Sequence, residues 1–209
     1  MSDIPASKAF VEGPEERRAD SLGMWVFLGT EAMLFGAILV GYLIIRLKYP
    51  AAFAGGSHEL SLVIGTLNTA ILLTSSFAMA AAVAMAKAGV WRNARIALLV
   101  TVILGFAFLG AKAYEYWDDV QEGLLPILAP FHYQGPDPLH AALFFNLYLL
   151  MTSVHGVHLI IGIAMLAYVG LTRRLPPQRH AQWIESVGLY WHFVDIVWIF
   201  LFPLLYLVR

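Results

Sequence analysis

The sequence of 209 residues contains no cysteine, and only 13% of its residues are charged. Without cysteine, the chain cannot form disulfides, thiolate zinc sites, iron–sulfur clusters or a cysteine nucleophile. Lys and Arg number 13 against 14 Asp and Glu, so there is no basic field to attract nucleic acid. Soluble domains carry about 25% charged residues. The shortage of charge therefore excludes an ordinary soluble enzyme.

Apolar residues make up 60% of the chain, and aromatic residues make up 13%. The mean hydropathy is +0.72. Intrinsic disorder is excluded by this composition, because disordered chains are poor in aromatic and branched apolar residues. The composition predicts a polytopic membrane protein.

Five apolar stretches are each near or above the ~20 residues that a helix needs to cross a bilayer. They cover residues 22–45, 60–86, 96–116, 141–171 and 187–208. None alternates with the period of two that a membrane β-strand requires. We therefore predict an all-α fold with one five-helix transmembrane domain over residues 22–209. Residues 1–21, which are rich in acidic side chains, are predicted to form a solvated N-terminal arm.

Basic residues are distributed unequally between the two sides of these spans. One side has only Arg46, Lys48 and Arg209, whereas the other has Lys8, Arg17, Arg18, Lys87, Arg92, Arg95, Arg173, Arg174 and Arg179. Cytoplasmic loops carry the excess of Lys and Arg. The asymmetry predicts a cytoplasmic N-terminus, an external C-terminus and an external, turn-rich loop over residues 117–139.

Several ionisable residues fall inside the predicted spans, where each needs a partner because charge at bilayer depth is expensive. Glu31 lies in the first span, and His155 and His158 share a face of the fourth. We expect the two histidines to be the partners of Glu31. Two interpretations of these three residues remain open: structural contacts within the bundle, or a proton-linked or regulatory role.

Two further pairs have the same spacing of three residues. His192 and Asp195 in the fifth span are predicted to pair locally and to fix that helix against its neighbours. Lys112 and Glu115 are predicted to form a pair at the outer end of the third span, with Lys112 extending toward the interface.

A metal or haem site is not predicted from these residues. Di-iron sites in helical bundles need Glu-x-x-His on two helices, and this motif is absent from the sequence. A haem held between two histidines would need its ligands on facing helices, and His155 and His192 are the candidates for such a pair. We expect no cofactor in this chain.

Small and hydroxyl side chains follow one another at helical spacing in the second span. They are Gly65, Asn68, Thr69, Ser75 and Ser76. Such residues let helix backbones approach closely in lipid. They predict a packing face, which meets either another helix of this chain or another subunit.

Three motifs resemble subunit III of haem–copper terminal oxidases. The second span contains Gly65-Thr66-Leu67-Asn68-Thr69, the fourth contains His155-Gly156-Val157-His158, and the fifth contains Trp191-His192-Phe193-Val194-Asp195-Ile196-Val197-Trp198. Glu31, after Trp25, and the Glu115-Tyr116 pair also match family positions. The likeness extends over nearly the whole chain from Leu22.

The resemblance implies a five-helix bacterial form in the cytoplasmic membrane and a non-catalytic role. Such a subunit packs on subunit I beside subunit II, holds phospholipid in a cleft between helix groups, and supports proton uptake and stability. Haem and copper are then expected in the partner subunits. If the first two spans form one group and the last three another, basic residues at the rims are candidates for lipid phosphates. They are Arg46, Lys48, Arg92, Arg95, Arg173 and Arg174.

The resemblance does not separate the branches of the family. The Asn68-Thr69 form favours cytochrome c oxidases over quinol oxidases, and a homologue associated with nitric oxide reductase shares the motifs. An alternative from another class is a proton-coupled transporter that uses Glu31 and Asp195. Inverted repeats or broken helices would support that alternative, and the sequence has no sign of either.

Overall fold

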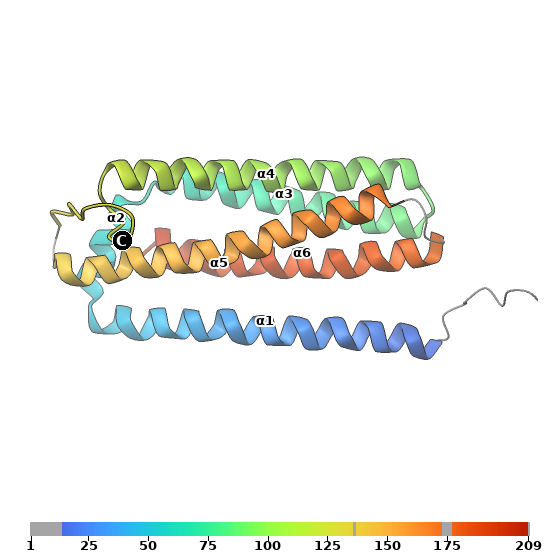
Figure 1. Cartoon of the computed structure of the whole chain (residues 1–209), viewed down its shortest axis with the longest axis horizontal. Helices are drawn as coiled ribbons and strands as arrows, with labels where there is room; N and C mark the ends of the chain where they lie inside the picture. Colours follow the sequence, from blue (N-terminus) through green and yellow to red (C-terminus); the bar gives the residue numbers. More distant parts are fainter. Residues whose placement is uncertain (1–13, 136, 173–176, 209) are drawn as a thin grey trace, which may run out of the picture.

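The computed structural model describes residues 14–135, 137–172 and 177–208 (Figure 1). These residues form helices and no strand, and five of the helices are long and apolar enough to cross a membrane. The helices are α1 (Pro14–Lys48), α2 (Pro50–Glu59), α3 (Leu62–Lys87), α4 (Trp91–Gln121), α5 (Pro138–Leu171) and α6 (Pro177–Tyr206). The prediction of an all-α fold with five spans is confirmed.

Most helices extend beyond the apolar stretches that predicted them. Part of the expected arm, residues 14–21, is helical and continuous with α1. At both ends α4 passes the predicted limits of 96 and 116, so the start of the expected external loop is helical. Hydropathy marks only where a helix is apolar. The backbone hydrogen bonds continue into polar sequence until a residue such as Gly123, with φ of 68°, ends the helix.

The short helix α2 is a feature that the hydropathy pattern did not predict. Its ten residues cannot span a bilayer. Pro50 occupies the first turn, where its missing N–H costs nothing. Phe53 is fully buried, with its ring 5.5 Å from that of Phe144 on α5. A Cβ on Gly56 would lie 2.4 Å from the same ring, so this glycine allows α2 to approach α5.

Helices α3 to α6 form the bundle, and α1 lies to one side of it (Figure 1). Because α3 packs closely on α4 and α6, the expected grouping of the first two spans is wrong. The small residues of α3 explain this, since they permit close approach to α6. Between α1 and the bundle, Tyr42 donates a hydrogen bond of 2.6 Å to the Leu204 carbonyl.

The two ends of the described chain lie at opposite ends of the molecule (Figure 1). A chain that crosses a membrane an odd number of times ends on the side opposite to its start, so this arrangement agrees with five spans. Described basic residues at the end where α1 begins include Lys87, Arg92 and Arg95. The cytoplasmic assignment of this end stays a prediction.

Candidate functional site: the buried polar groups

Lys112 is at the centre of a buried polar cluster inside the bundle. Its side chain is 6% exposed, and that of Glu115 is 2% exposed. The Lys112 ammonium donates to Glu115 Oε2, to the Tyr148 hydroxyl and to the Tyr206 hydroxyl, each at 3.0 Å. All three of its N–H groups are therefore used. The predicted pairing with Glu115 is confirmed, but the expectation that Lys112 extends to the interface is wrong, because α5 and α6 enclose it.

The two tyrosines connect the ammonium to two carboxylates. Tyr206 donates to Glu115 Oε1 at 2.6 Å, and Tyr148 donates to Asp119 Oδ2 at 3.1 Å. Each hydroxyl thus accepts from Lys112 and donates to an acid. We refer to Lys112, Glu115, Asp119, Tyr148 and Tyr206 as the Lys112 cluster.

Sequence reasoning missed Asp119, Tyr148 and Tyr206 as members of this cluster. The external loop predicted over residues 117–139 includes Asp119, yet this residue is only 5% exposed. The usable signal was helical spacing, since positions 112, 115 and 119 share one face of a helix. The tyrosines come from α5 and α6, and their approach depends on tertiary packing.

Glu31 on α1 pairs with His158 on α5. The distance from His158 Nε2 to Glu31 Oε2 is 2.9 Å, and the two side chains are 13% and 17% exposed. His158 Nδ1 lies 2.8 Å from the Val154 carbonyl, which can only accept, so Nδ1 carries a proton. The prediction of a histidine partner is confirmed for His158.

We expect Glu31→Ala to lower the stability of the folded protein by about 1–3 kcal/mol, because His158 Nε2 would lose its partly buried partner. Glu31→Gln should have a smaller effect, since the amide can donate to Nε2. The measurement is the thermal unfolding midpoint of the purified protein in detergent. Thr30→Ala, at an exposed neighbour on α1, is the control and should change stability by less than about 0.5 kcal/mol. Equal losses in the Ala and Gln variants would show that the negative charge, and not the hydrogen bond, is what matters.

His155 does not join Glu31, although it shares the helix with His158. It is fully buried, and neither ring nitrogen has a hydrogen-bond partner among the described residues. Its ring lies 5.6 Å from Phe108 and 5.2 Å from Trp198. The expectation that His155 is a partner of Glu31 is therefore wrong. The two histidines point to different helices: His155 toward α4 and α6, and His158 toward α1.

The predicted local pair of His192 and Asp195 is not formed. His192 Nδ1 instead lies 2.7 Å from the Ser76 hydroxyl on α3. Asp195 is 3% exposed, and neither carboxyl oxygen has a hydrogen-bond partner in the described part of the chain. The two side chains therefore form no hydrogen bond with each other, despite a spacing that favours contact. His192 does fix α6 against its neighbour, but through a hydroxyl.

The packing face predicted on α3 meets α6 and α4 of the same chain. Trp198 Nε1 donates to Thr69 Oγ1 at 3.0 Å, and Trp191 Nε1 donates to Ser75 Oγ at 3.1 Å. A Cβ on Gly65 would lie 2.8 Å from the Tyr206 ring. Asn68 is fully buried, and its amide has no hydrogen-bond partner among the described residues. These contacts account for the face by packing inside the chain.

Metal-ligating side chains do not gather in the described ranges, where no three His, Cys, Asp or Glu residues could hold an ion together. The possible haem ligands His155 and His192 are engaged separately. One lies between aromatic rings, and the other bonds to Ser76. Their surroundings do not fit a shared haem.

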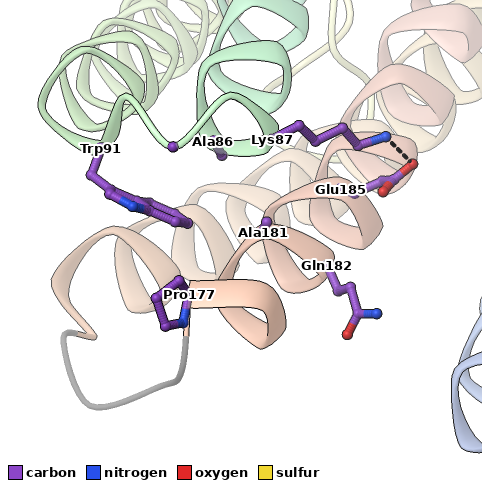
Figure 2. A pocket seen from close by; sticks show the side chains of 8 residues that line it. Ala86, Lys87, Trp91, Pro177, Ala181, Gln182 and Glu185 are labelled. Carbon is purple, nitrogen blue, oxygen red and sulfur yellow. Dashed lines mark hydrogen bonds and ion pairs between the residues drawn. The ribbon is translucent and has the colours of Figure 1, made fainter. Parts of the chain in front are cut away.

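A surface pocket of about 370 Å³ opens where α3, α4 and α6 meet at the end of the bundle (Figure 2). Figure 2 shows the Trp91 and Pro177 rings at one end of it and Lys87 and Glu185 at the other. Lys87 Nζ lies 2.7 Å from Glu185 Oε1, and the two side chains are 53% and 45% exposed. Sequence reasoning did not anticipate this pair, which joins α3 to α6.

The basic residues named as lipid candidates occupy different settings. Arg46 is half-buried and Lys48 exposed in the last turn of α1, and Arg92 is exposed on α4. Arg173 and Arg174 lie outside the described residues. Arg95 lines a groove of about 260 Å³ between α4 and α5, and its Nε is buried without a hydrogen-bond partner among the described residues. The other lining residues are apolar or glycine: Leu98, Leu99, Val102, Leu166, Ala167, Gly170 and Leu171.

Comparison with known proteins gives the same family as the three motifs. A family model described as cytochrome c oxidase subunit III matches residues 15–208. Cytochrome c oxidase subunit 3 of Thermostichus vulcanus is 34% identical over 190 residues, which cover 90% of this chain and 86% of that protein. Quinol oxidase subunit 3 of Bacillus subtilis (strain 168) is 31% identical over 202 residues, covering 93% and 89%. The chain is a multi-pass membrane protein that belongs to the subunit III family of haem–copper oxidases.

Proposed function

We propose that this chain is the non-catalytic subunit III of a bacterial cytochrome c oxidase and packs on subunit I in the cytoplasmic membrane. The observation that carries the proposal is the family match over residues 15–208, because it covers every helix of the bundle. In this proposal haem and copper belong to the partner subunits. Polar side chains inside the spans of this chain serve contacts between its helices, as the Glu31–His158 and His192–Ser76 pairs illustrate.

Co-purification tests the association. A tag on this chain should recover haem-containing subunits from native membranes, with a Soret band in the recovered fraction. The chain separated from its partners should lose that band. Recovery of this chain alone from gently solubilised native membranes would contradict the proposal.

The proposal also names the electron donor of the complex. Cytochrome c is favoured by the Asn68-Thr69 form of the second-span motif and by the relative from Thermostichus vulcanus. A quinol donor is the second candidate, supported by the Bacillus subtilis relative. Oxygen consumption by the purified complex, supplied with reduced cytochrome c or with a quinol, distinguishes them. Faster turnover with the quinol would select the second candidate.

We further propose that the chain supports proton uptake and durability of the complex and binds phospholipid. The groove between α4 and α5 supports lipid binding, because an apolar wall there ends at a guanidinium with an unpaired buried N–H. Guanidinium groups bind phosphate oxygens through charge-assisted hydrogen bonds. An acyl chain against Leu98 and Leu166 would place its phosphate beside Arg95.

We expect Arg95→Gln to reduce the amount of anionic phospholipid retained by the purified complex. The reason is that an amide keeps polarity but lacks the charge and forked donors of arginine. Retained lipid is measured by mass spectrometry after washing in detergent. Arg92→Gln is the matched control, since Arg92 is exposed in the same turn and does not line the groove. Equal retention in the Arg95 variant and the control would exclude this groove as the lipid site.

Durability has a separate test. The complex with this chain and the complex stripped of it should start at similar rates of oxygen consumption. The stripped complex should then lose activity sooner during sustained turnover. If both decline at the same rate, the chain has no protective role.

A further inference from the structure

The Lys112 cluster contains one cationic side chain and two acidic ones in a site that water scarcely reaches. Lys112, Glu115 and Asp119 are 5%, 2% and 5% exposed. With all three ionised, the cluster would hold one negative charge in excess. An uncompensated buried charge costs several kcal/mol, whereas a buried pair with complete hydrogen bonding is tolerated. One added proton would make the cluster neutral.

We propose that the Lys112 cluster is a proton-binding site, in which the Asp119 carboxyl group takes up and releases one proton to water at the end of α4. The exchange is a plain transfer: a hydronium ion gives its proton to the Asp119 carboxylate and leaves water, and release is the reverse. Lys112 keeps its three N–H groups and its charge throughout. The proposal rests on the geometry of this chain and goes beyond its assignment to an oxidase.

The hydrogen bonds assign the proton to Asp119 instead of Glu115. Glu115 accepts from the Lys112 ammonium and from Tyr206, one donor on each oxygen. Among the residues that the structure describes, Asp119 accepts a side-chain hydrogen bond from Tyr148 alone, at the longer distance of 3.1 Å. Donors to a carboxylate favour its ionised form. The acid with fewer donors, none of them charged, is therefore the one that binds the proton.

The titratable neighbours on the surrounding helices support the same assignment. Glu122, the residue directly after α4, follows Asp119 by three residues and adds negative charge on the water side, which favours proton binding. Tyr116 on α4 is engaged with Thr152 on α5 at 2.5 Å. From α5, His155 lies beside the Trp198 ring, which Lys112 Nζ also approaches. The α6 helix contributes Tyr206, and α3 contributes Gly65 beside it.

The position of Asp119 provides a route to water. It lies two residues before the end of α4 at Gln121. Its neighbour Asp118 is exposed, and the chain turns at Gly123 directly afterwards. Glu115 lies about one turn deeper and Lys112 about two turns deeper. The proton-binding acid is thus the outermost member of the cluster.

Infrared spectroscopy of the purified complex tests the proposal, because a protonated carboxyl group has a C=O stretch that ionised carboxylates lack. Difference spectra between acidic and alkaline pH, in H₂O and D₂O, should contain such a band in the wild type. The band should be absent from Asp119→Asn. It should persist in Asp118→Asn, the control one residue away at an exposed site, and in Glu115→Gln.

Stability gives an independent readout. Asparagine resembles the neutral acid, so Asp119→Asn should assemble normally and match the wild type at acidic pH. As pH rises, the wild type loses the bound proton and the stability that depends on it, while the Asn variant does not. The unfolding midpoints should therefore separate toward alkaline pH, with the variant higher. A wild-type band that survives in Asp119→Asn, its loss in Glu115→Gln, failure of Asp119→Asn to assemble, or a pH-independent difference in midpoints would each overturn the proposal.

Discussion

Replacing Lys112 with methionine is expected to lower the free energy of unfolding by about 3–5 kcal/mol, the cost of removing one partner from a buried ion pair. Methionine has similar length and fits the apolar surroundings, so the loss comes from the ammonium. Glu115 Oε2 and the hydroxyls of Tyr148 and Tyr206 would each lose a donor. The measurement is the thermal unfolding midpoint of the purified protein, together with its yield from membranes.

The chain contains a matched control for this substitution. Lys87 on α3 also pairs with a glutamate, Glu185 on α6. This pair lies at the surface, where both side chains are about half exposed. Lys87→Met should cost no more than about 1 kcal/mol, because exposed ion pairs contribute little. Adding Glu115→Gln to Lys112→Met should recover part of the loss, since the uncompensated charge is removed. Equal effects at Lys87 and Lys112 would show that burial of the cluster does not determine its contribution.

The number and type of helices could be predicted from sequence because hydropathy reports directly on what lipid requires. Five runs of about 20 apolar residues predict five membrane-spanning helices, and the structure contains five helices of this kind. The ends of the helices were harder to predict, because backbone hydrogen bonding continues into polar segments such as residues 117–121. The non-spanning α2 was missed because an Ala- and Gly-rich decapeptide has no periodic signal.

The candidate site was predicted only as far as spacing along one helix could carry it. Lys112 with Glu115 and Glu31 with His158 are confirmed. His192 and Asp195 have the same spacing as Lys112 and Glu115 but form no hydrogen bond, and His192 instead pairs with Ser76 on α3. The tyrosines of the Lys112 cluster come from helices 36 and 94 residues away in sequence. Contacts between helices depend on how the bundle packs, which spacing within one helix does not encode.

Trp191 is where four helices of the bundle meet. The side chain is fully buried on α6, and its Nε1 donates to Ser75 on α3. A Cβ on Gly105 of α4 would lie 2.9 Å from the indole, and one on Gly162 of α5 would lie 3.0 Å from it. The two glycines therefore provide the space that the ring occupies.

Trp191→Ala is accordingly expected to destabilise the protein by about 3–5 kcal/mol, the range for removing a large aromatic side chain from a core. Two glycines line the resulting cavity, and their lack of side chains leaves little to fill it. Trp191→Phe should lose less, because it retains a ring and gives up the hydrogen bond to Ser75. Trp183→Ala is the control on the same helix. Trp183 is 45% exposed, and its removal should cost about 1 kcal/mol. The comparison uses unfolding midpoints of the four purified proteins, wild type included. Similar losses at positions 183 and 191 would mean that α3, α4 and α5 do not depend on this ring for their packing, and that the small residues along their contacts hold the bundle together without it.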